Sequence, residues 1–113
     1  MRVFYKIIDM GAWRDAEASG AFRGAAIDLK DGYIHLSTGA QLKETARLHF
    51  AGATNLALVA IDEAVVLSDL KWETSRGGQL FPHVYGSINP TRILWVKPMP
   101  WNGEAHDFPP EVI

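Results

Sequence analysis

The chain has 113 residues, which suffice for one hydrophobic core but not for two, so we expect a single domain over residues 1–113. Its hydrophobic share of 48%, charged share of 21% and net charge of -2 give no general attraction to nucleic acid or anionic lipid. Without cysteine, a long apolar run or a signal-peptide pattern, the sequence excludes disulfides and thiolate chemistry and favours a cytoplasmic protein that spans no membrane.

The first elements are a strand and a helix. Residues 3–8 are rich in β-branched and aromatic side chains, which predicts a strand. Asp9 is a suitable N-cap for a short helix, and Gly20 is a natural end for it. We expect a loop after Gly20.

A second helix is predicted from its cap. Residues 33–37 read as a strand, and Thr38 follows with Gln41 three positions later, which is the spacing of a capping box. Apolar side chains recur along one face until the helix ends near Gly52.

The second half of the chain predicts further strands. Residues 56–61 are apolar throughout, as in a central strand buried on both faces, whereas residues 65–67 suggest an edge fragment or a turn. Residues 70–73 alternate in polarity, and residues 92–97 form the last clear strand. We expect the proline-rich tail, residues 98–113, to lie on the surface of the domain.

Two segments each place a histidine in a short strand, D-G-Y-I-H-L-S at residues 31–37 and F-P-H-V-Y-G at residues 81–86. Side chains alternate along a strand, so each segment has one face that is too polar for a core. These faces carry Tyr33, His35 and Ser37 in the first segment and Phe81, His83 and Tyr85 in the second. If the two faces meet, they form an aromatic pocket with two imidazoles.

With K-W-E at residues 71–73, these segments resemble the signature of a small bacterial family, domain-of-unknown-function family 952. The resemblance covers nearly the whole chain in order and spacing. It implies relatives rather than a particular chemistry, because the family carries no established activity.

That family is similar in fold to the ADP-ribosyltransferase-like proteins, which bind NAD in a cleft between two small antiparallel sheets. We therefore predict an α+β fold with a bent or split, mainly antiparallel sheet and two principal helices. In that group an early-strand histidine, commonly in a Tyr-His pair, contacts the NAD ribose. This chain has Tyr5 and Lys6 at that place, and a charged lysine donates hydrogen bonds but accepts none.

The resemblance and the strand faces together suggest roles for individual residues. His35, His83 and Glu73 are the candidate catalytic residues, with Glu73 near the ribose or an oxocarbenium-like centre. The candidate ligand-binding residues are Tyr5, Lys6, Tyr33, Ser37, Arg76 and Tyr85. Within this set, a tyrosine would stack on a ring, and Arg76 would meet a phosphate from a mobile loop over residues 75–79.

Each of these residues also has a purely structural interpretation. His35 can cap a strand end, Tyr85 can be a core tyrosine, and Glu73 can pair in solvent with Lys71 or Arg76. Two further histidines have structural interpretations: His49 lies on the apolar face of the predicted helix, at the boundary of the core, and His106 is expected to be exposed in the tail.

Three functions are compatible with this pattern. The first is an enzyme that binds NAD or an ADP-ribose-type nucleotide as substrate and catalyses glycosyl transfer or hydrolysis. The second is a non-catalytic ligand-sensing or protein-interaction module that keeps the cleft. The third is a metal site built from His35, His83 and Glu73, which the sequence supports only weakly because it contains no pair of histidines four residues apart. We expect no nucleic-acid or membrane partner, and a monomer or weak homodimer.

Overall fold

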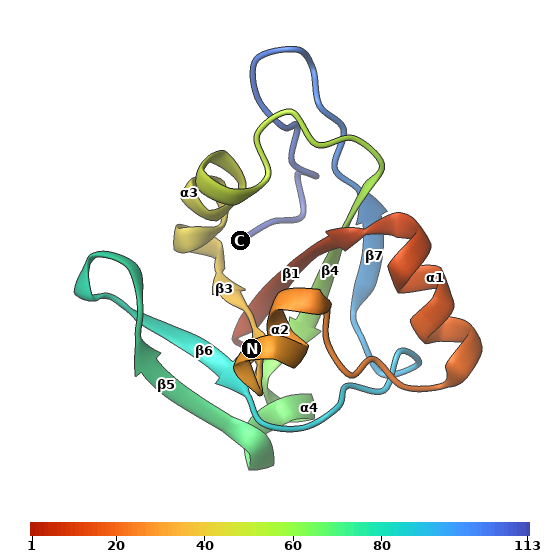
Figure 1. Cartoon of the computed structure of the whole chain (residues 1–113), viewed down its shortest axis with the longest axis vertical. Coiled ribbons are helices and arrows are strands. Elements are labelled where there is room, and N and C mark those ends of the chain that lie inside the picture. Colours follow the sequence, from red (N-terminus) through yellow and green to blue (C-terminus); the bar gives the residue numbers. More distant parts are fainter.

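The computed structural model describes the backbone of all 113 residues and every side chain except that of Arg76. In this described chain, seven strands form two antiparallel sheets, and four α-helices accompany them (Figure 1). The structure is therefore α+β with a split sheet. None of the described helices is long and apolar enough to cross a membrane.

The larger sheet has the order β3-β1-β4-β7. Its strands are β1 (Val3–Asp9), β3 (Ser37–Thr38), β4 (Leu56–Asp62) and β7 (Trp95–Pro98). β1 and β4 pair along their whole length, whereas β3 pairs with only two residues of β1. The strands predicted at residues 3–8 and 56–61 are thus confirmed, and the last strand begins three residues later than predicted.

The smaller sheet has the order β2-β6-β5, with β2 (Ile34–His35), β6 (Leu80–Val84) and β5 (Leu70–Thr74). β5 and β6 form a hairpin whose turn contains Gly77 and Gly78 at φ 63° and 77°. Residues with a Cβ rarely adopt such angles, which explains the glycine pair. The Arg76 side chain, proposed to meet a phosphate, lies outside the described residues.

The two principal helices begin where their caps predict. α1 (Met10–Ser19) starts after Asp9, whose carboxylate accepts a hydrogen bond from the Ala12 amide at 3.1 Å. α3 (Gly39–His49) starts with the reciprocal capping box of Thr38 and Gln41. Local side-chain chemistry therefore fixes the start of both helices.

A third helix, α2 (Ala26–Asp31), lies where the sequence predicts only a loop. Its N-cap, Ala25, has no side chain that can cap a helix, so the usual signal is missing. The cap comes instead from inside the helix, because the Asp28 carboxylate accepts a hydrogen bond from the Ala25 amide at 2.8 Å. The prediction of a loop is wrong for this reason.

A fourth helix, α4 (Glu63–Val66), and the 3-10 turn Leu67–Asp69 replace the edge fragment or turn expected at residues 65–67. The Asp62 carboxylate accepts a hydrogen bond from the Ala64 amide at 3.0 Å and so ends β4 by starting a helix. The apolar residues 65–67 are compatible with a strand fragment or with a helical turn. The Asp62 cap that precedes them favours the helix.

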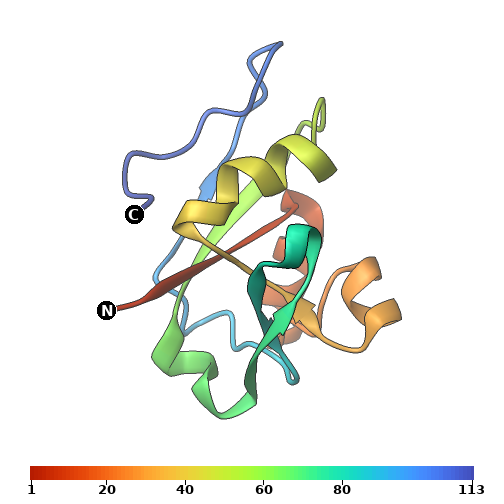
Figure 2. The same cartoon turned by 90° about the vertical axis from the view of Figure 1, so that its left-hand side faces the viewer.

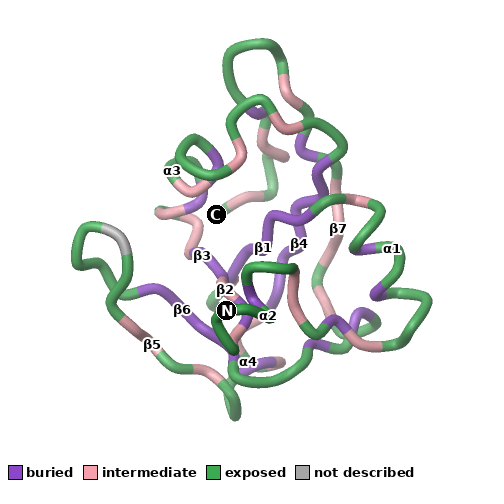
Figure 3. The backbone as a smooth tube through the Cα atoms, viewed as in Figure 1, coloured by how far each residue is buried: buried purple, intermediate pink, exposed green. Residues whose placement is uncertain are grey.

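The larger sheet lies between two apolar layers. On one face lie α3 and the C-terminal segment (Figure 2). They pack against side chains of the sheet that include Leu58. On the other face, α1 and the smaller sheet pack against side chains that include Val59. Both residues are fully buried, and β4 is buried over nearly its whole length (Figure 3), which is why its sequence is apolar without alternation.

The segment after β7 returns to α3. Met99 is fully buried, and His106, expected to be exposed, is buried as well. The His106 Nε2 atom lies 3.0 Å from the Ala53 carbonyl oxygen, and its ring contacts Trp101. The expectation of an exposed His106 is wrong because a proline-rich segment can still pack its few aromatic side chains.

We predict that Gly39→Ala releases the end of this segment. A Cβ at position 39 would overlap the backbone oxygen of Ile113. The Ile113 amide also donates a hydrogen bond to the Tyr5 hydroxyl at 3.0 Å. The helix should persist, because alanine is favoured over glycine in helices by about 1 kcal/mol. Hydrogen exchange should show loss of protection at the Ile113 amide, and the nearby Ala40→Ser should not; unchanged protection in Gly39→Ala would contradict the packing.

Candidate active site

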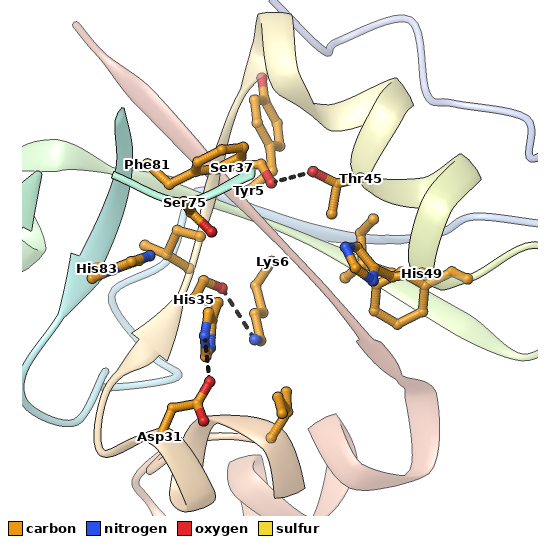
Figure 4. A pocket seen from close by; sticks show the side chains of 14 residues that line it. Tyr5, Lys6, Asp31, His35, Ser37, Thr45, His49, Ser75, Phe81 and His83 are labelled. Atoms are coloured by element: carbon orange, nitrogen blue, oxygen red, sulfur yellow. Dashed lines mark hydrogen bonds and ion pairs between the residues drawn. The ribbon is translucent and has the colours of Figure 1, made fainter. Parts of the chain in front are cut away.

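The split between the sheets opens a cavity. β2 belongs to the smaller sheet and β3 to the larger one, and the buried Leu36 between them donates its amide hydrogen to the Pro82 carbonyl at 3.1 Å. Beyond the short β3, a cavity of about 520 Å³ lies along β1, a volume typical of small-molecule sites (Figure 4).

Both sheets and two helices supply the walls of this cavity. Its apolar lining consists of Tyr5, Ile7, Ile27, Leu36, Phe50 and Phe81. Its polar lining consists of Lys6, Asp31, His35, Ser37, Thr45, His49, Ser75 and His83. Three of the four histidines of the chain therefore face one cavity.

His35 and His83 are direct cross-strand neighbours of β2 and β6. Their ring centroids are 5.3 Å apart in an edge-to-face arrangement. The Tyr33 ring stacks on the His83 ring with 4.2 Å between the ring centroids, and the centroid of the Tyr85 ring lies 5.2 Å from that of Tyr33. The structure thus brings together the two polar strand faces on which the sequence-based site depends.

Charged residues hold every polar atom of His35. Its amide donates to Asp28 Oδ1 at 3.1 Å, and its carbonyl accepts a hydrogen bond from Lys6 Nζ at 3.0 Å. Its ring atoms Nδ1 and Nε2 lie 2.6 Å from Asp28 Oδ1 and 3.0 Å from Asp31 Oδ2. The ring is therefore fixed from both sides.

Asp28 is the buried centre of this network, with a side chain that has no solvent exposure. Burial alone would raise its pKa, but hydrogen bonds from His35 and the charge of Lys6 outweigh burial and lower the pKa to about 2. Burial also lowers the pKa of Lys6, against the opposing charge of Asp28. An ionised Asp28 accepts hydrogen bonds only, which assigns a hydrogen to His35 Nδ1.

His83 has a carboxylate partner of its own. Its Nδ1 atom lies 2.8 Å from Glu73 Oε1, and the Tyr85 hydroxyl donates to the same oxygen at 2.7 Å. The hydrogen bonds from Tyr85 and His83 lower the pKa of Glu73, and the bond to Glu73 raises the pKa of Tyr85 to about 12. The ionised Glu73 assigns a hydrogen to Nδ1 of His83.

The second ring nitrogen of His83 is available to a ligand. Within the part of the chain that the structure describes, Nε2 of His83 has no hydrogen-bond partner, and the His83 side chain lines the cavity with 3% of its surface exposed. In the neutral ring with hydrogen on Nδ1, Nε2 carries a lone pair. A carboxylate that orients an imidazole in this way is the usual support of a histidine base.

Metal binding receives no support from the described residues, which contain no group of three or more histidine, cysteine, aspartate or glutamate side chains placed to hold an ion. In particular, the Nδ1 atoms of His35 and His83 are already bonded to carboxylates.

Residues 7–96 match the family described as "Protein of unknown function (DUF952)". The chain belongs to this family. His35, Glu73, His83 and Tyr85 lie within the matched region of this DUF952 protein, whereas Tyr5 and Lys6 precede it.

Solved structures are similar along almost the whole DUF952 chain. The crystal structure of protein CC0527 from Caulobacter crescentus has a TM-score of 0.88 and 40% identity, covering 93% of each chain. The solution NMR structure of CC0527 has a TM-score of 0.83 and 40% identity, covering 94% of this chain and 91% of that one. No curated protein is significantly similar to the chain.

Of the other candidate residues of the DUF952 protein, some line the cavity and others lie outside it. The Tyr5 ring lines the cavity, but its hydroxyl points to Ile113. The Ser37 hydroxyl lies 2.9 Å from that of Thr45. Glu73, Tyr33 and Tyr85 do not line the cavity and lie behind or beside His83.

Sequence reasoning missed Asp28 and Asp31, because it placed no helix at their positions. One signal was present. Lys6 interrupts an otherwise apolar strand, and a lysine buried in a strand requires a carboxylate partner.

Acid should destabilise the DUF952 protein partly through Asp28. Its folded pKa of about 2 is below the ordinary value of 3.8, so the unfolded chain takes up a proton first as the pH falls. The stabilisation, about 2 kcal/mol, is complete above pH 4 and is lost between about pH 4 and pH 2. Urea unfolding between about pH 4 and pH 2 should show this loss of unfolding free energy in the wild type but not in Lys6→Met/Asp28→Ala. An equal change of unfolding free energy with pH in both proteins would refute the prediction.

Proposed function

We propose that the protein binds a nucleotide of the NAD or ADP-ribose type in the cavity between its sheets and acts on the glycosidic bond. One observation carries this proposal: His35 and His83 are adjacent in the wall of a ligand-sized cavity, and each is oriented by a carboxylate. The apolar part of the lining suits a heteroaromatic ring, and the hydroxyls of Ser37, Thr45 and Ser75 suit a ribose.

His83 is the base in this proposal. As the bond between ribose C1′ and the nicotinamide nitrogen breaks, its electron pair goes to the nitrogen, and the oxygen of water or an acceptor hydroxyl bonds to C1′. The Nε2 atom of His83 takes the proton of that oxygen. Glu73 accepts a hydrogen bond from Nδ1 of His83 at 2.8 Å and stabilises the resulting imidazolium.

The choice of ligand rests on the resemblance inferred from the sequence to the ADP-ribosyltransferase fold group, in which NAD binds between two antiparallel sheets. The two antiparallel sheets and the cavity at their junction are compatible with that mode of binding. Lys6, at the position of the early-strand histidine of that group, would act through His35 rather than touch the ribose, because its hydrogen bonds go to Asp28 and His35.

Binding without turnover is the alternative, and the place of Glu73 favours it. Glycosyl chemistry of this kind uses a carboxylate close to the positive charge that develops at C1′. Glu73 does not line the cavity, and the one carboxylate that does, among the described side chains, is Asp31, which contacts His35. A ligand-sensing module would bind the same nucleotide and release no nicotinamide.

Titration of the purified protein with ADP-ribose and NAD tests the proposal. We expect saturable binding and, at a ligand concentration of 100 times Kd, about 2.7 kcal/mol of added stability in a thermal-shift measurement. His35→Ala should abolish binding, whereas the matched variant His106→Gln, outside this cavity, should bind as the wild type does. Absence of binding by the wild type would refute the proposal.

Nicotinamide release separates the enzyme from the sensor. With NAD present, the wild type should release nicotinamide, and His83→Gln and Glu73→Gln should release it more slowly while still binding ADP-ribose. Glu104→Gln is the control for a lost surface carboxylate. Binding without any release would establish the sensing alternative.

A further inference from the structure

A buried ion pair lies beneath the candidate site. The side chains of Lys6 and Asp28 are 7% and 0% exposed, and Lys6 Nζ lies 2.8 Å from Asp28 Oδ2. Lys6 comes from β1 of the larger sheet and Asp28 from α2, and both contact His35 of the smaller sheet. The pair therefore joins three elements at the point where the two sheets part.

The ammonium group of Lys6 is held by protein atoms. It lies 3.0 Å from Asp28 Oδ1, 2.8 Å from Asp28 Oδ2 and 3.0 Å from the His35 carbonyl oxygen. Two of these contacts, to Asp28 Oδ1 and to the His35 carbonyl oxygen, are hydrogen bonds, so protein atoms use at least two of the three N–H donors of the ammonium group. Although Lys6 contributes to the cavity lining, its hydrogen bonds go to Asp28 and to the His35 carbonyl, so it acts on the position of His35.

A single carboxylate oxygen of Asp28 binds two atoms of His35. Its Oδ1 atom accepts hydrogen bonds from the His35 amide at 3.1 Å and from Nδ1 of the ring at 2.6 Å. Backbone and ring are thereby held together, and the Nε2 atom is left on the side of Asp31 and the cavity (Figure 4). Lys6 holds the carbonyl of the same residue from the other side.

We infer that Lys6 and Asp28 are positioning residues, which together set the orientation of the His35 ring in the cavity wall and keep a hydrogen on its Nδ1 atom. A carboxylate behind a metal-binding imidazole has this role, and its loss lowers metal affinity or activity about 10–100-fold. By analogy, we expect an effect of similar size on the ligand affinity of this site. The expected effect on ligand affinity rests on the proposed function, whereas the effect on the His35 ring does not.

The test uses a charge-balanced variant, Lys6→Met/Asp28→Ala, which removes both buried charges at once. Long-range ¹H–¹⁵N NMR spectra of the imidazoles report which ring nitrogen carries hydrogen. In the wild type we expect His35 to show hydrogen on Nδ1, and in the variant we expect this signature to be lost while that of His83 is retained. Affinity for ADP-ribose should fall about 10–100-fold.

Lys97→Met/Glu111→Ala is the matched control, since this ion pair is exposed and lies outside the cavity. It should change neither the His35 spectrum nor the affinity. If Lys6→Met/Asp28→Ala folds with an unchanged His35 spectrum, or binds ADP-ribose as the wild type does, the inference is wrong.

The wild type provides a second, independent measurement. A hydrogen shared by Nδ1 and a buried carboxylate at 2.6 Å should give a slowly exchanging resonance. If that resonance is missing, the inference fails even when the double variant does not fold. If the wild type binds no ADP-ribose, the proposed function fails, and the two NMR measurements still decide whether Lys6 and Asp28 position His35.

Discussion

Asp28→Ala should lower the free energy of unfolding by about 3–5 kcal/mol, which is a large share of the stability of a small domain. The substitution leaves the Lys6 ammonium buried without its counterion, and this uncompensated charge is the main cost. It also removes the acceptor of the Ala25 and His35 amides. Urea unfolding monitored by tryptophan fluorescence measures the loss.

The double variant Lys6→Met/Asp28→Ala should be more stable than Asp28→Ala alone, because no buried charge is left unpaired. Glu111→Ala removes a carboxylate from an exposed ion pair and should change stability little. A double variant as unstable as Asp28→Ala would show that lost hydrogen bonds, and not the stranded charge of Lys6, cause the effect.

Leu58→Ala should cost about 2–5 kcal/mol. The Leu58 side chain is fully buried in the layer between β4 and α3, so its truncation removes apolar contacts and leaves a cavity. His35→Ala should cost less, because the His35 side chain is 31% exposed and Asp28 keeps Lys6 as its partner. Chemical denaturation of the three proteins gives the comparison.

Leu67→Ala is the matched control for leucine truncation, because Leu67 is 60% exposed and should tolerate the change. If His35→Ala is as unstable as Leu58→Ala, then His35 serves mainly to hold the sheets together. Such a result would weaken the proposal that His35 is retained for ligand binding.

The two sets of variants concern different parts of the same junction. Leu58 stabilises the layer that supports β1 from the α3 side, and Asp28 stabilises the junction from the cavity side. A ligand in the cavity should offset part of the loss in either variant, since any molecule that binds only the folded state stabilises it.

The sequence by itself determined those features whose cause is local. Asp9, Gly20 and the pair Thr38 and Gln41 mark helix ends because capping involves residues within one turn. The apolar run of β4 indicates burial on both faces. Strand alternation likewise places Ile34 and Leu36 in the core and His35 on the other face.

Only the tertiary structure decided which strand faces meet at the cavity and which charged residues support the histidines there. The pairing of His35 with His83 joins residues 48 positions apart, and the partner of Lys6 is an aspartate 22 positions away in a helix with no recognisable cap. The cavity exists because the chain leaves one sheet for the other at Leu36. Long-range pairing and the partners of buried charges depend on the packing of the whole chain, and no local pattern specifies them.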